Sequence, residues 1–102
     1  MERVYGYRAV LIKDTPDDQT LGVVFPELPG CVSAGDTIEE ASVMAHEALA
    51  GYLEVSVLDG DALPAPVETD APLPDWFAEI TPMVEVARIM VRVRVDVAAV
   101  PA

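Results

Sequence analysis

The stretch FPELPGCVSAGDTIEEA, residues 25–41, holds two prolines, two glycines and the only cysteine of the 102-residue chain. Pro26 and Pro29 lack the backbone N–H that a β ladder needs, so they end the apolar run before them. The glycine that follows allows a positive φ at the bend, and residues 31–34 are expected to form a short strand. The stretch is therefore predicted to be a structural corner rather than a catalytic loop built around Cys31.

The same stretch ends in the start of a helix. Thr37 followed by Glu40 fits the capping-box pattern, and Asp36 followed by Glu39 offers the same pattern one residue earlier. Either Asp36 or Thr37 is therefore the predicted N-cap of a helix that ends before the Asp-Gly pair at residues 59–60. Apolar residues at steps of three and four predict its buried face: Ile38, Ala41, Ala45, Ala48, Leu49, Tyr52 and Leu53.

The segments on either side of this core have the composition of strands. Residues 4–13 are rich in β-branched and aromatic residues, and residues 21–25 are the expected hairpin partner across a polar turn. The aspartates of that turn lack the glycine and the terminal glutamate of a calcium loop, which predicts a solvated tip. Residues 83–97 form the expected final strand, because valines alternate with charged residues over its second half.

The order β-β-β-α-β predicts an α+β fold, a two-layer sandwich of one sheet and one helix. A single domain would span residues 1–97, with a core at 1–58, a proline-rich crossover at 59–82, the final strand at 83–97 and a tail at 98–102. Within the crossover, Trp76 and Phe77 are expected to anchor one or two helical turns. The final strand either joins its own sheet or adds to the edge of a neighbouring subunit, which would give a homodimer or higher oligomer.

Charge is the strongest global feature of the chain. It has 18 acids against 6 bases, a net charge of −12, and no Lys or Arg occurs between Asp14 and Ala87. The acids in that interval number 16, which is 18 less Glu2 and Asp96. Such a surface repels phosphate backbones, so no direct nucleic-acid binding is expected, and it suits a basic protein partner. A purely solubilising role for the acids is the alternative.

The sequence shows no sign of membrane insertion or secretion. No apolar run approaches the ~20 residues of a membrane span, and the N-terminus lacks the apolar core of a signal peptide. The single cysteine excludes an internal disulfide, so a cytoplasmic location is expected.

No catalytic residue, metal site or cofactor is predicted. Cys31 would need a base to act as a nucleophile, and the only histidine, His46, lies on the flank of the predicted helix. Cysteine is among the residue types most often buried, so a structural Cys31 is favoured. Asp36, Glu39 and Glu40 stand at a helix N-terminus, where carboxylates cap amide groups and complement the helix dipole, which favours structure over metal binding.

The opening stretch resembles the signature of the HicB-type antitoxins and their stand-alone relatives. That signature runs as an apolar strand, F-P-x-L-P-G-C, a small stretch, G-D-(T/S)-x-E-E-A and an alanine-rich helix. The likeness extends from the start of the chain to Pro66. The matching signature positions are Phe25, Pro26, Leu28, Pro29, Gly30, Cys31, Gly35, Asp36, Thr37, Glu39, Glu40 and Ala41.

The resemblance implies a partial ribonuclease-H-like fold and a protein that binds and silences a small basic HicA ribonuclease toxin. Many members also repress their own operon through a C-terminal DNA-binding domain. Only AAVPA follows Val97, so the resemblance is to the stand-alone form. Acidic residues on the outer helix face and at the helix start are the candidate toxin-binding residues: Asp36, Glu39, Glu40, Glu47 and Glu54.

The alternative function is a stand-alone HicB-like domain that self-associates as a structural or regulatory protein, with no toxin partner and no catalysis. The absence of a DNA-binding segment and the length of the final strand motivate this alternative. A small basic reading frame beside the gene would favour the antitoxin.

Overall fold

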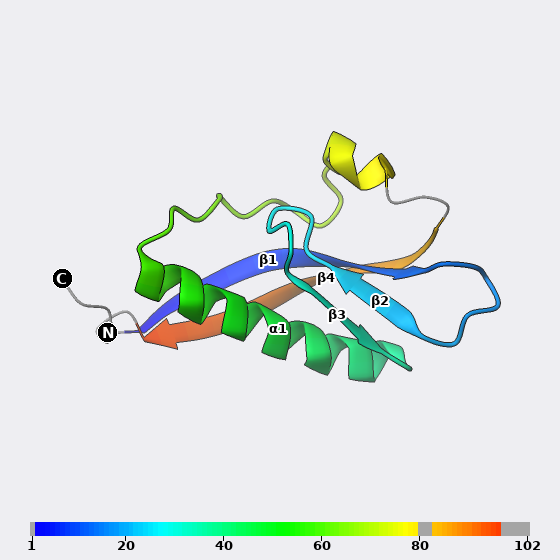
Figure 1. The fold of residues 1–102 in the computed structure, drawn as a ribbon, viewed down its shortest axis with the longest axis horizontal. Coiled ribbons are helices and arrows are strands. Elements are labelled where there is room, and N and C mark those ends of the chain that lie inside the picture. Colours follow the sequence, from blue (N-terminus) through cyan, green and yellow to red (C-terminus); the bar gives the residue numbers. More distant parts are fainter. Residues whose placement is uncertain (1, 80–82, 97–102) are drawn as a thin grey trace.

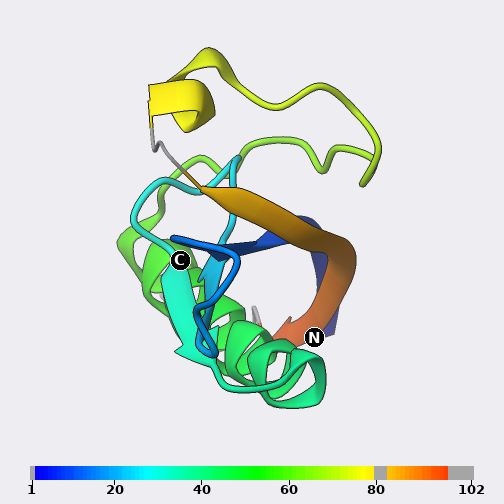
Figure 2. The same ribbon diagram turned by 90° about the vertical axis from the view of Figure 1, so that its right-hand side faces the viewer.

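The computed structural model describes residues 2–79 and 83–96, which form one sheet and one long helix (Figure 1). Four antiparallel strands, β1 (Glu2–Lys13), β2 (Leu21–Val24), β3 (Val32–Gly35) and β4 (Val84–Asp96), lie in the order β3-β2-β1-β4. Helix α1 (Ile38–Asp59) covers one face of the sheet. A 3-10 helix, η1 (Asp75–Glu79), lies in the crossover on the other side (Figure 2). The predicted α+β fold with its β-β-β-α-β order is confirmed.

The final strand joins its own sheet. β4 pairs with β1 along the whole length of both strands, from Glu2 opposite Asp96 to Lys13 opposite Val84. Of the two arrangements predicted for this strand, pairing within its own sheet is therefore the one that the structure shows. Val97, the predicted last residue of the strand, lies outside the described residues.

Strand β1 is buried on both of its faces. Tyr7, Ala9 and Leu11 belong to the main core beneath α1, whereas Val10 and Ile12 belong to a second apolar cluster on the opposite face. Because successive side chains of a strand point to opposite faces, this burial requires a cover on each side of the sheet. Helix α1 supplies one cover, and the crossover supplies the other over part of the sheet (Figure 2).

The crossover is attached to the second face through its aromatic residues. Phe77 of η1 is only 4% exposed and packs with Val10, Ile12 and Val24. Trp76 is partly buried against the same cluster, and its ring centroid lies 5.8 Å from that of Phe77. Both residues therefore act as the predicted anchors, and the short helical segment around them is confirmed.

The corner between β2 and β3 is closed by three backbone hydrogen bonds. The N–H of Phe25 donates to the Cys31 carbonyl (3.2 Å), that of Leu28 to the Phe25 carbonyl (3.0 Å) and that of Cys31 to the Leu28 carbonyl (2.9 Å). Gly30 has a φ of 93°, which only glycine adopts readily. The third strand was predicted at residues 31–34 but begins at Val32, because the N–H of Cys31 is used inside the turn.

Helix α1 begins with a complete capping box. The Thr37 side chain accepts a hydrogen bond from the Glu40 N–H (3.0 Å), and the Glu40 carboxylate accepts one from the Asp36 N–H (3.3 Å), so Thr37 is the N-cap. The helix ends at Asp59, before Gly60 in the left-handed conformation.

The prediction for Ile38 is wrong, because this first helical residue is 51% exposed. The helix meets the sheet only one turn later, at Ala41, which is fully buried. From there the predicted face is buried at Ala41, Ala45, Leu49 and Leu53 and partly buried at Ala48 and Tyr52, and Ser56, which was not predicted, is buried as well.

Gly35 explains how closely the helix start approaches the sheet. A Cβ atom at Gly35 would lie 2.5 Å from the backbone nitrogen of Ala41. Real Cβ atoms do not approach backbone this closely, so any side chain at position 35 would push α1 away from β3. The glycine of the signature G-D-T is thus required by packing between the end of β3 and the first turn of α1.

Arg8 is the largest fully buried side chain, with 1% exposure, and it lies on the face of β1 that the crossover covers. Its guanidinium makes a two-pronged ion pair with Glu27, with Nε 3.0 Å from Oε1 and Nη2 2.9 Å from Oε2. The pair joins β1 to the corner after β2. This paired geometry is the one in which a buried arginine is best compensated.

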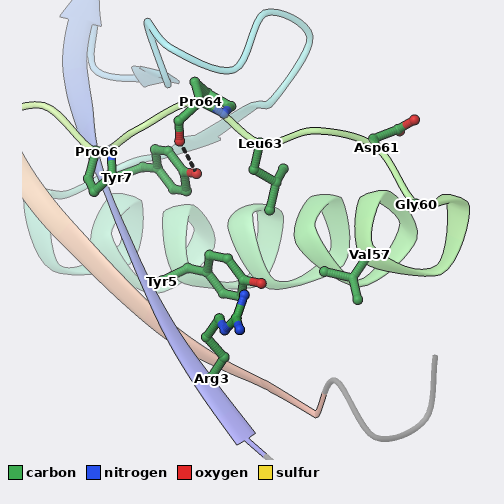
Figure 3. A pocket seen from close by; sticks show the side chains of 9 residues that line it. All are labelled: Arg3, Tyr5, Tyr7, Val57, Gly60, Asp61, Leu63, Pro64 and Pro66. Atoms are coloured by element: carbon green, nitrogen blue, oxygen red, sulfur yellow. Dashed lines mark hydrogen bonds between the residues drawn. The ribbon is translucent and has the colours of Figure 1, made fainter. Parts of the chain in front are cut away.

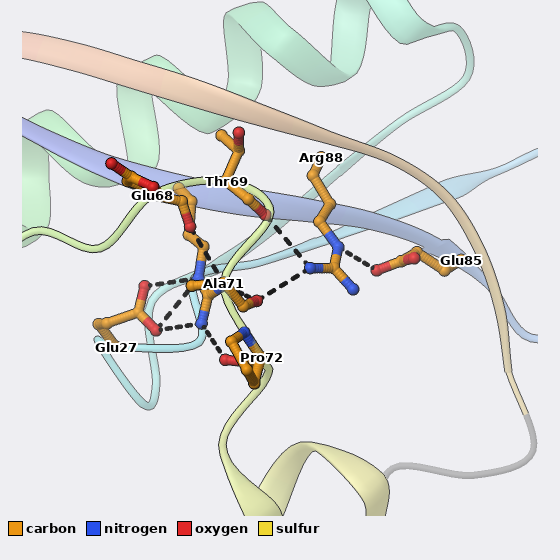
Figure 4. Close-up of polar contacts among 8 residues, drawn as sticks. Glu27, Glu68, Thr69, Ala71, Pro72, Glu85 and Arg88 are labelled. Atoms are coloured by element: carbon orange, nitrogen blue, oxygen red, sulfur yellow. Dashed lines mark hydrogen bonds and ion pairs between the residues drawn. The ribbon is translucent and has the colours of Figure 1, made fainter.

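The other N–H groups of the Arg8 guanidinium donate hydrogen bonds to backbone carbonyls of the crossover. They donate to the carbonyls of Glu68, Ala71 and Pro72. Arg88 on β4 donates to the Ala71 carbonyl as well, at 3.1 Å, and to that of Thr69, at 3.2 Å (Figure 4). We call these contacts of Arg8 and Arg88 the arginine clamp, which holds residues 68–72 against the sheet.

Replacing Gly35 and Gly51 by alanine should shift stability in opposite directions. We expect Gly35→Ala to lower the free energy of unfolding by about 1–3 kcal/mol, because the new methyl group collides with the backbone of α1. Gly51→Ala should raise the free energy of unfolding by about 0.5–1 kcal/mol. Alanine favours the helix over glycine, and its Cβ would meet no atom of another element within 4 Å. Urea unfolding of both variants measures the difference, and equal effects would contradict the packing role of Gly35.

Removing Arg8 should release the crossover. We expect Arg8→Met to lower the free energy of unfolding by about 3 kcal/mol, because the Glu27 carboxylate stays buried without its partner. Limited proteolysis should then cut residues 61–72 faster than in the unchanged protein. The double variant Arg8→Met with Glu27→Leu should recover part of the stability but not the protection of the crossover. Unchanged cleavage of the crossover in Arg8→Met would contradict the clamp.

Candidate functional site

The face of α1 that points away from the sheet carries a continuous row of exposed residues. Val43 is 59% exposed and Leu58 is 52% exposed, although both are apolar. Acids alternate with these residues, and α1 contains no Lys or Arg to pair with them. We call this row, whose members recur at steps of three and four, the outer stripe: Glu40, Val43, Glu47, Gly51, Glu54 and Leu58.

Three of the five predicted partner-binding residues, Glu40, Glu47 and Glu54, lie in the outer stripe. Within residues 2–79 and 83–96, none of these three glutamates takes part in an ion pair. The sequence-based prediction identified the acids but missed the apolar members of the stripe. Their signal was present, because Val43 and Leu58 follow the same helical spacing as the glutamates.

The other two predicted residues lie at or near the helix start. Glu39 is exposed beside the outer stripe, and Asp36 is exposed just before the N-cap. The Asp36 carboxylate accepts a 3.4 Å hydrogen bond from the Thr20 hydroxyl, so it also ties the helix start to the β1–β2 hairpin. Among the described residues, no group of three or more His, Cys, Asp or Glu side chains is placed to hold a metal ion.

Cys31 is a core residue, only 3% exposed, as predicted. Burial raises the pKa of its thiol to about 11. The nucleophilic thiolate is therefore scarce at neutral pH. His46, the only histidine and the candidate base for Cys31, is exposed on α1. The two residues thus lie in different environments, and the structure gives Cys31 a packing role.

An open cavity of about 510 Å³ lies between the start of β1, the end of α1 and the first residues of the crossover (Figure 3). Arg3, Tyr5 and Tyr7 line it from β1, and the Tyr7 hydroxyl donates a 2.6 Å hydrogen bond to the Pro64 carbonyl. Burial, reinforced by the neighbouring tyrosines, raises the pKa of Tyr7. Neither Cys31 nor His46 lines this cavity. The cavity therefore does not bring together the cysteine nucleophile and the histidine base that were considered from the sequence.

A family model of the HicB-like antitoxins of bacterial toxin–antitoxin systems matches residues 7–100. The chain belongs to this family. The resemblance carried by the signature stretch is therefore confirmed, and it extends over most of the chain rather than to Pro66 alone. None of the helices in the described part of this HicB-like protein is long and apolar enough to span a membrane.

Solved structures of antitoxins share the fold. A toxin–antitoxin complex from Streptococcus pneumoniae aligns with a TM-score of 0.68 and 24% identity, over 94% of this chain and 71% of that chain. The HicA3–HicB3 toxin–antitoxin complex aligns with a TM-score of 0.61 and 25% identity, over 85% of this chain and 95% of that chain. The N-terminal domain of the antitoxin HicB from Burkholderia pseudomallei aligns with a TM-score of 0.55 and 21% identity, over 90% of this chain and 99% of that chain.

A phage protein provides a sequence relative. The uncharacterized 14.9 kDa protein in the rep-hol intergenic region of Haemophilus phage HP1 is 38% identical over 66 residues. The aligned region is 63% of this chain and 50% of the phage protein, so the chain spans half the length of that relative.

The raised pKa of Cys31 predicts a pH dependence of stability. Between pH 9 and pH 11 the thiol ionises in the unfolded chain while the folded protein keeps it protonated. The stabilising effect of the buried thiol is therefore complete below pH 9 and is lost as the pH rises toward 11. We expect urea unfolding to show a steeper loss of stability over this range in the unchanged protein than in Cys31→Val.

The pKa of Tyr7 is also raised by burial, but Tyr7 is present in both proteins, so the difference between their pH profiles reports Cys31. Thiol labelling by Ellman's reagent at pH 8 should be slow in the folded protein and rapid in urea. Rapid labelling of the folded protein, or parallel pH profiles for the two proteins, would contradict the burial of a protonated thiol.

Proposed function

We propose that this HicB-like protein is an antitoxin that binds a small basic HicA-type ribonuclease toxin through the outer stripe of α1. The family match and the likeness to the HicA3–HicB3 complex support a toxin partner. The observation that carries the choice of surface is the outer stripe itself. It is exposed, acidic and partly apolar, and its glutamates form no ion pair within the described residues.

An acidic helix face suits a ribonuclease partner because a ribonuclease holds RNA phosphates with basic side chains. Carboxylates of the antitoxin then compete with RNA phosphates for the same groups, so binding blocks substrate access without chemistry. The interval from Asp14 to Ala87 has acids but no Lys or Arg. Its summed negative potential should steer a basic toxin toward α1 and speed their encounter.

Val43 and Leu58 would add an apolar contact with the toxin to the ionic contacts of the glutamates. Exposed charges at the rim of an interface act mainly on the association rate, whereas apolar residues near its centre slow dissociation. Val43 lies between Glu40 and Glu47, so an apolar contact there would be surrounded by ionic ones. Apart from the neighbouring backbone of α1 itself, no atom lies within 4 Å of the Cβ position of Gly51, which leaves room for a partner side chain to approach the helix backbone.

Self-association is the alternative role for this domain, and it is compatible with toxin binding. The outer stripe lies on α1, whereas the long strand β4 forms an edge of the sheet. The two proposed kinds of partner would therefore use separate parts of the molecule. We assign neither surface a catalytic function, in keeping with a family of antitoxins.

Neutralising the stripe should weaken toxin binding. We expect the triple variant Glu40→Gln, Glu47→Gln, Glu54→Gln to raise the Kd for a co-expressed HicA-type toxin at least about tenfold, equivalent to about 1.4 kcal/mol. The loss should appear mainly as slower association at low salt, because long-range attraction is reduced. Biolayer interferometry against the purified toxin measures both quantities. In cells, the variant should protect less well against toxin expression.

The matched control is Asp14→Asn, Asp17→Asn, Asp18→Asn, which removes the same charge from the exposed hairpin tip. This control should bind the toxin nearly as well as the unchanged protein. Equal weakening by both triple variants would mean that net charge, not the outer stripe, governs binding. A purified toxin that binds the stripe variant as tightly as the unchanged protein would place the interface elsewhere on the molecule.

A further inference from the structure

The open cavity beside the start of β1 is separate from the outer stripe, because no residue of the stripe lines it. Its walls come from three parts of the chain: Arg3, Tyr5 and Tyr7 of β1, Val57 of α1 and Leu63 of the crossover (Figure 3). Its volume of about 510 Å³ lies within the range of about 300–1,000 Å³ that is usual for small-molecule sites. The cavity is therefore large enough to be a binding site of its own.

Hydrogen bonds within the chain hold the walls of this cavity in place. Gly60, with a φ of 73°, closes the end of α1 by donating its N–H to a carbonyl of the last helical turn. The N–H of Asp61 donates to the Ser56 carbonyl at 2.9 Å. On the other side, the Tyr7 hydroxyl donates to the Pro64 carbonyl at 2.6 Å. Because the walls are already ordered, a ligand would lose little affinity to the cost of ordering them.

The apolar part of the cavity is an incompletely covered end of the main core. Tyr5, Val57 and Leu63 are partly buried hydrophobic residues that pack against that core. Figure 3 shows the Leu63 side chain pointing from the crossover into the space above Tyr5 and α1. An apolar group of a ligand placed there would complete the burial of these three side chains, which is favourable in water.

Arg3 and Tyr5 give the cavity a polar end. They lie two residues apart on β1, so their side chains share one face of the sheet. Figure 3 shows the Arg3 guanidinium beside the phenol ring of Tyr5. A guanidinium donates two parallel N–H groups to a carboxylate, and a phenol O–H can donate a further hydrogen bond. Among the described residues, Arg3 is the only basic one that lines the cavity.

The surrounding negative groups favour a ligand with a single negative charge. Asp61 lines the rim, and its carboxylate points away from Arg3 in Figure 3. The carbonyls of Ser56 and Val57 at the end of α1 accept hydrogen bonds from the chain that follows, so their partial charges are already compensated. One arginine neutralises one charge in a chain whose net charge is −12. A carboxylate therefore fits better than a phosphate monoester, which carries about −1.5 to −2 at pH 7.

We propose that this cavity binds a carboxylate on a small apolar body, with the carboxylate on Arg3 and Tyr5 and the apolar part against Val57 and Leu63. Two sources have this chemistry: a free apolar acid, and the C-terminal carboxylate of a peptide that ends in apolar residues. The ligand would contact β1, α1 and the crossover together. Neither the outer stripe nor the toxin takes part, so the proposal goes beyond the proposed function and is tested without it.

Isothermal titration calorimetry with hydrocinnamate tests the proposed ligand chemistry. We expect saturable binding of this acid, and binding at least about tenfold weaker for the neutral hydrocinnamide, which cannot pair with the guanidinium. Heteronuclear NMR during the same titration should shift the amide signals of Tyr5, Gly60 and Leu63, which locates the ligand. Absence of saturable binding at millimolar concentration, or equal Kd values for acid and amide, would overturn the proposal.

Two arginine variants separate the role of Arg3 from that of net charge. Arg3→Met keeps the aliphatic part of an exposed side chain and should weaken hydrocinnamate binding at least about tenfold. Arg94→Met removes the same charge from a side chain that is 77% exposed on the other face of the sheet, and should bind hydrocinnamate like the unchanged protein. Circular dichroism checks that both variants are folded. Equal weakening by the two variants would mean that no carboxylate site exists at Arg3.

A short peptide distinguishes the two sources of the carboxylate. Acetyl-Ala-Leu-Phe with a free C-terminus presents the end of a protein chain, and the same peptide with a C-terminal amide is its control. Tighter binding of the free peptide than of hydrocinnamate assigns the cavity to a protein C-terminus, and the reverse order assigns it to a small acid. Either order supports the site when Arg3→Met weakens both ligands, and ligands that bind Arg3→Met unchanged contradict it.

Discussion

The ion pair between Arg8 and Glu27 is the interaction on which the second layer of this protein depends. A guanidinium in a strand that is buried on both faces must have its charge and its N–H groups compensated inside the protein. Glu27 supplies the charge, and carbonyls of residues 68–72 take the remaining protons. Residues 68–72 of the proline-rich crossover are thereby held on the sheet by their backbone, whereas Trp76 and Phe77 anchor its later part through their side chains.

This arrangement separates the surfaces of the molecule. The crossover lies near Arg8 on the face of the sheet opposite α1 (Figure 2), and the outer side of α1 is exposed. All six bases lie on β1 and β4, where Arg8 and Arg88 build the clamp, and all acids except Glu2, Glu85 and Asp96 lie elsewhere in the chain. The outer side of α1 therefore carries acids and no base, whereas the arginines of the clamp serve the interior of the fold.

Local patterns were enough to predict most of the fold, and long-range contacts explain what was missed. The capping box, the alternating valines of β4 and the prolines of the corner each act within a few residues, so the sequence alone indicates them. Arg8 is different, because an arginine in a strand normally marks a solvated face. Its partners lie 19 to 64 residues away along the chain, and no short motif encodes them. Ile38 fits the helical spacing but precedes the contact of α1 with the sheet.

The family signature and the proposed binding surface occupy different residues, which has a physical reason. The signature positions form a buried corner, a glycine contact and a helix cap, and each of these tolerates few alternatives. Most of the outer stripe, from Val43 to Leu58, lies beyond the signature and faces solvent, where many side chains are compatible with the same fold. A HicB-like domain can therefore change its partner by exchanging residues on one helix face while the corner, the clamp and the sheet remain unchanged.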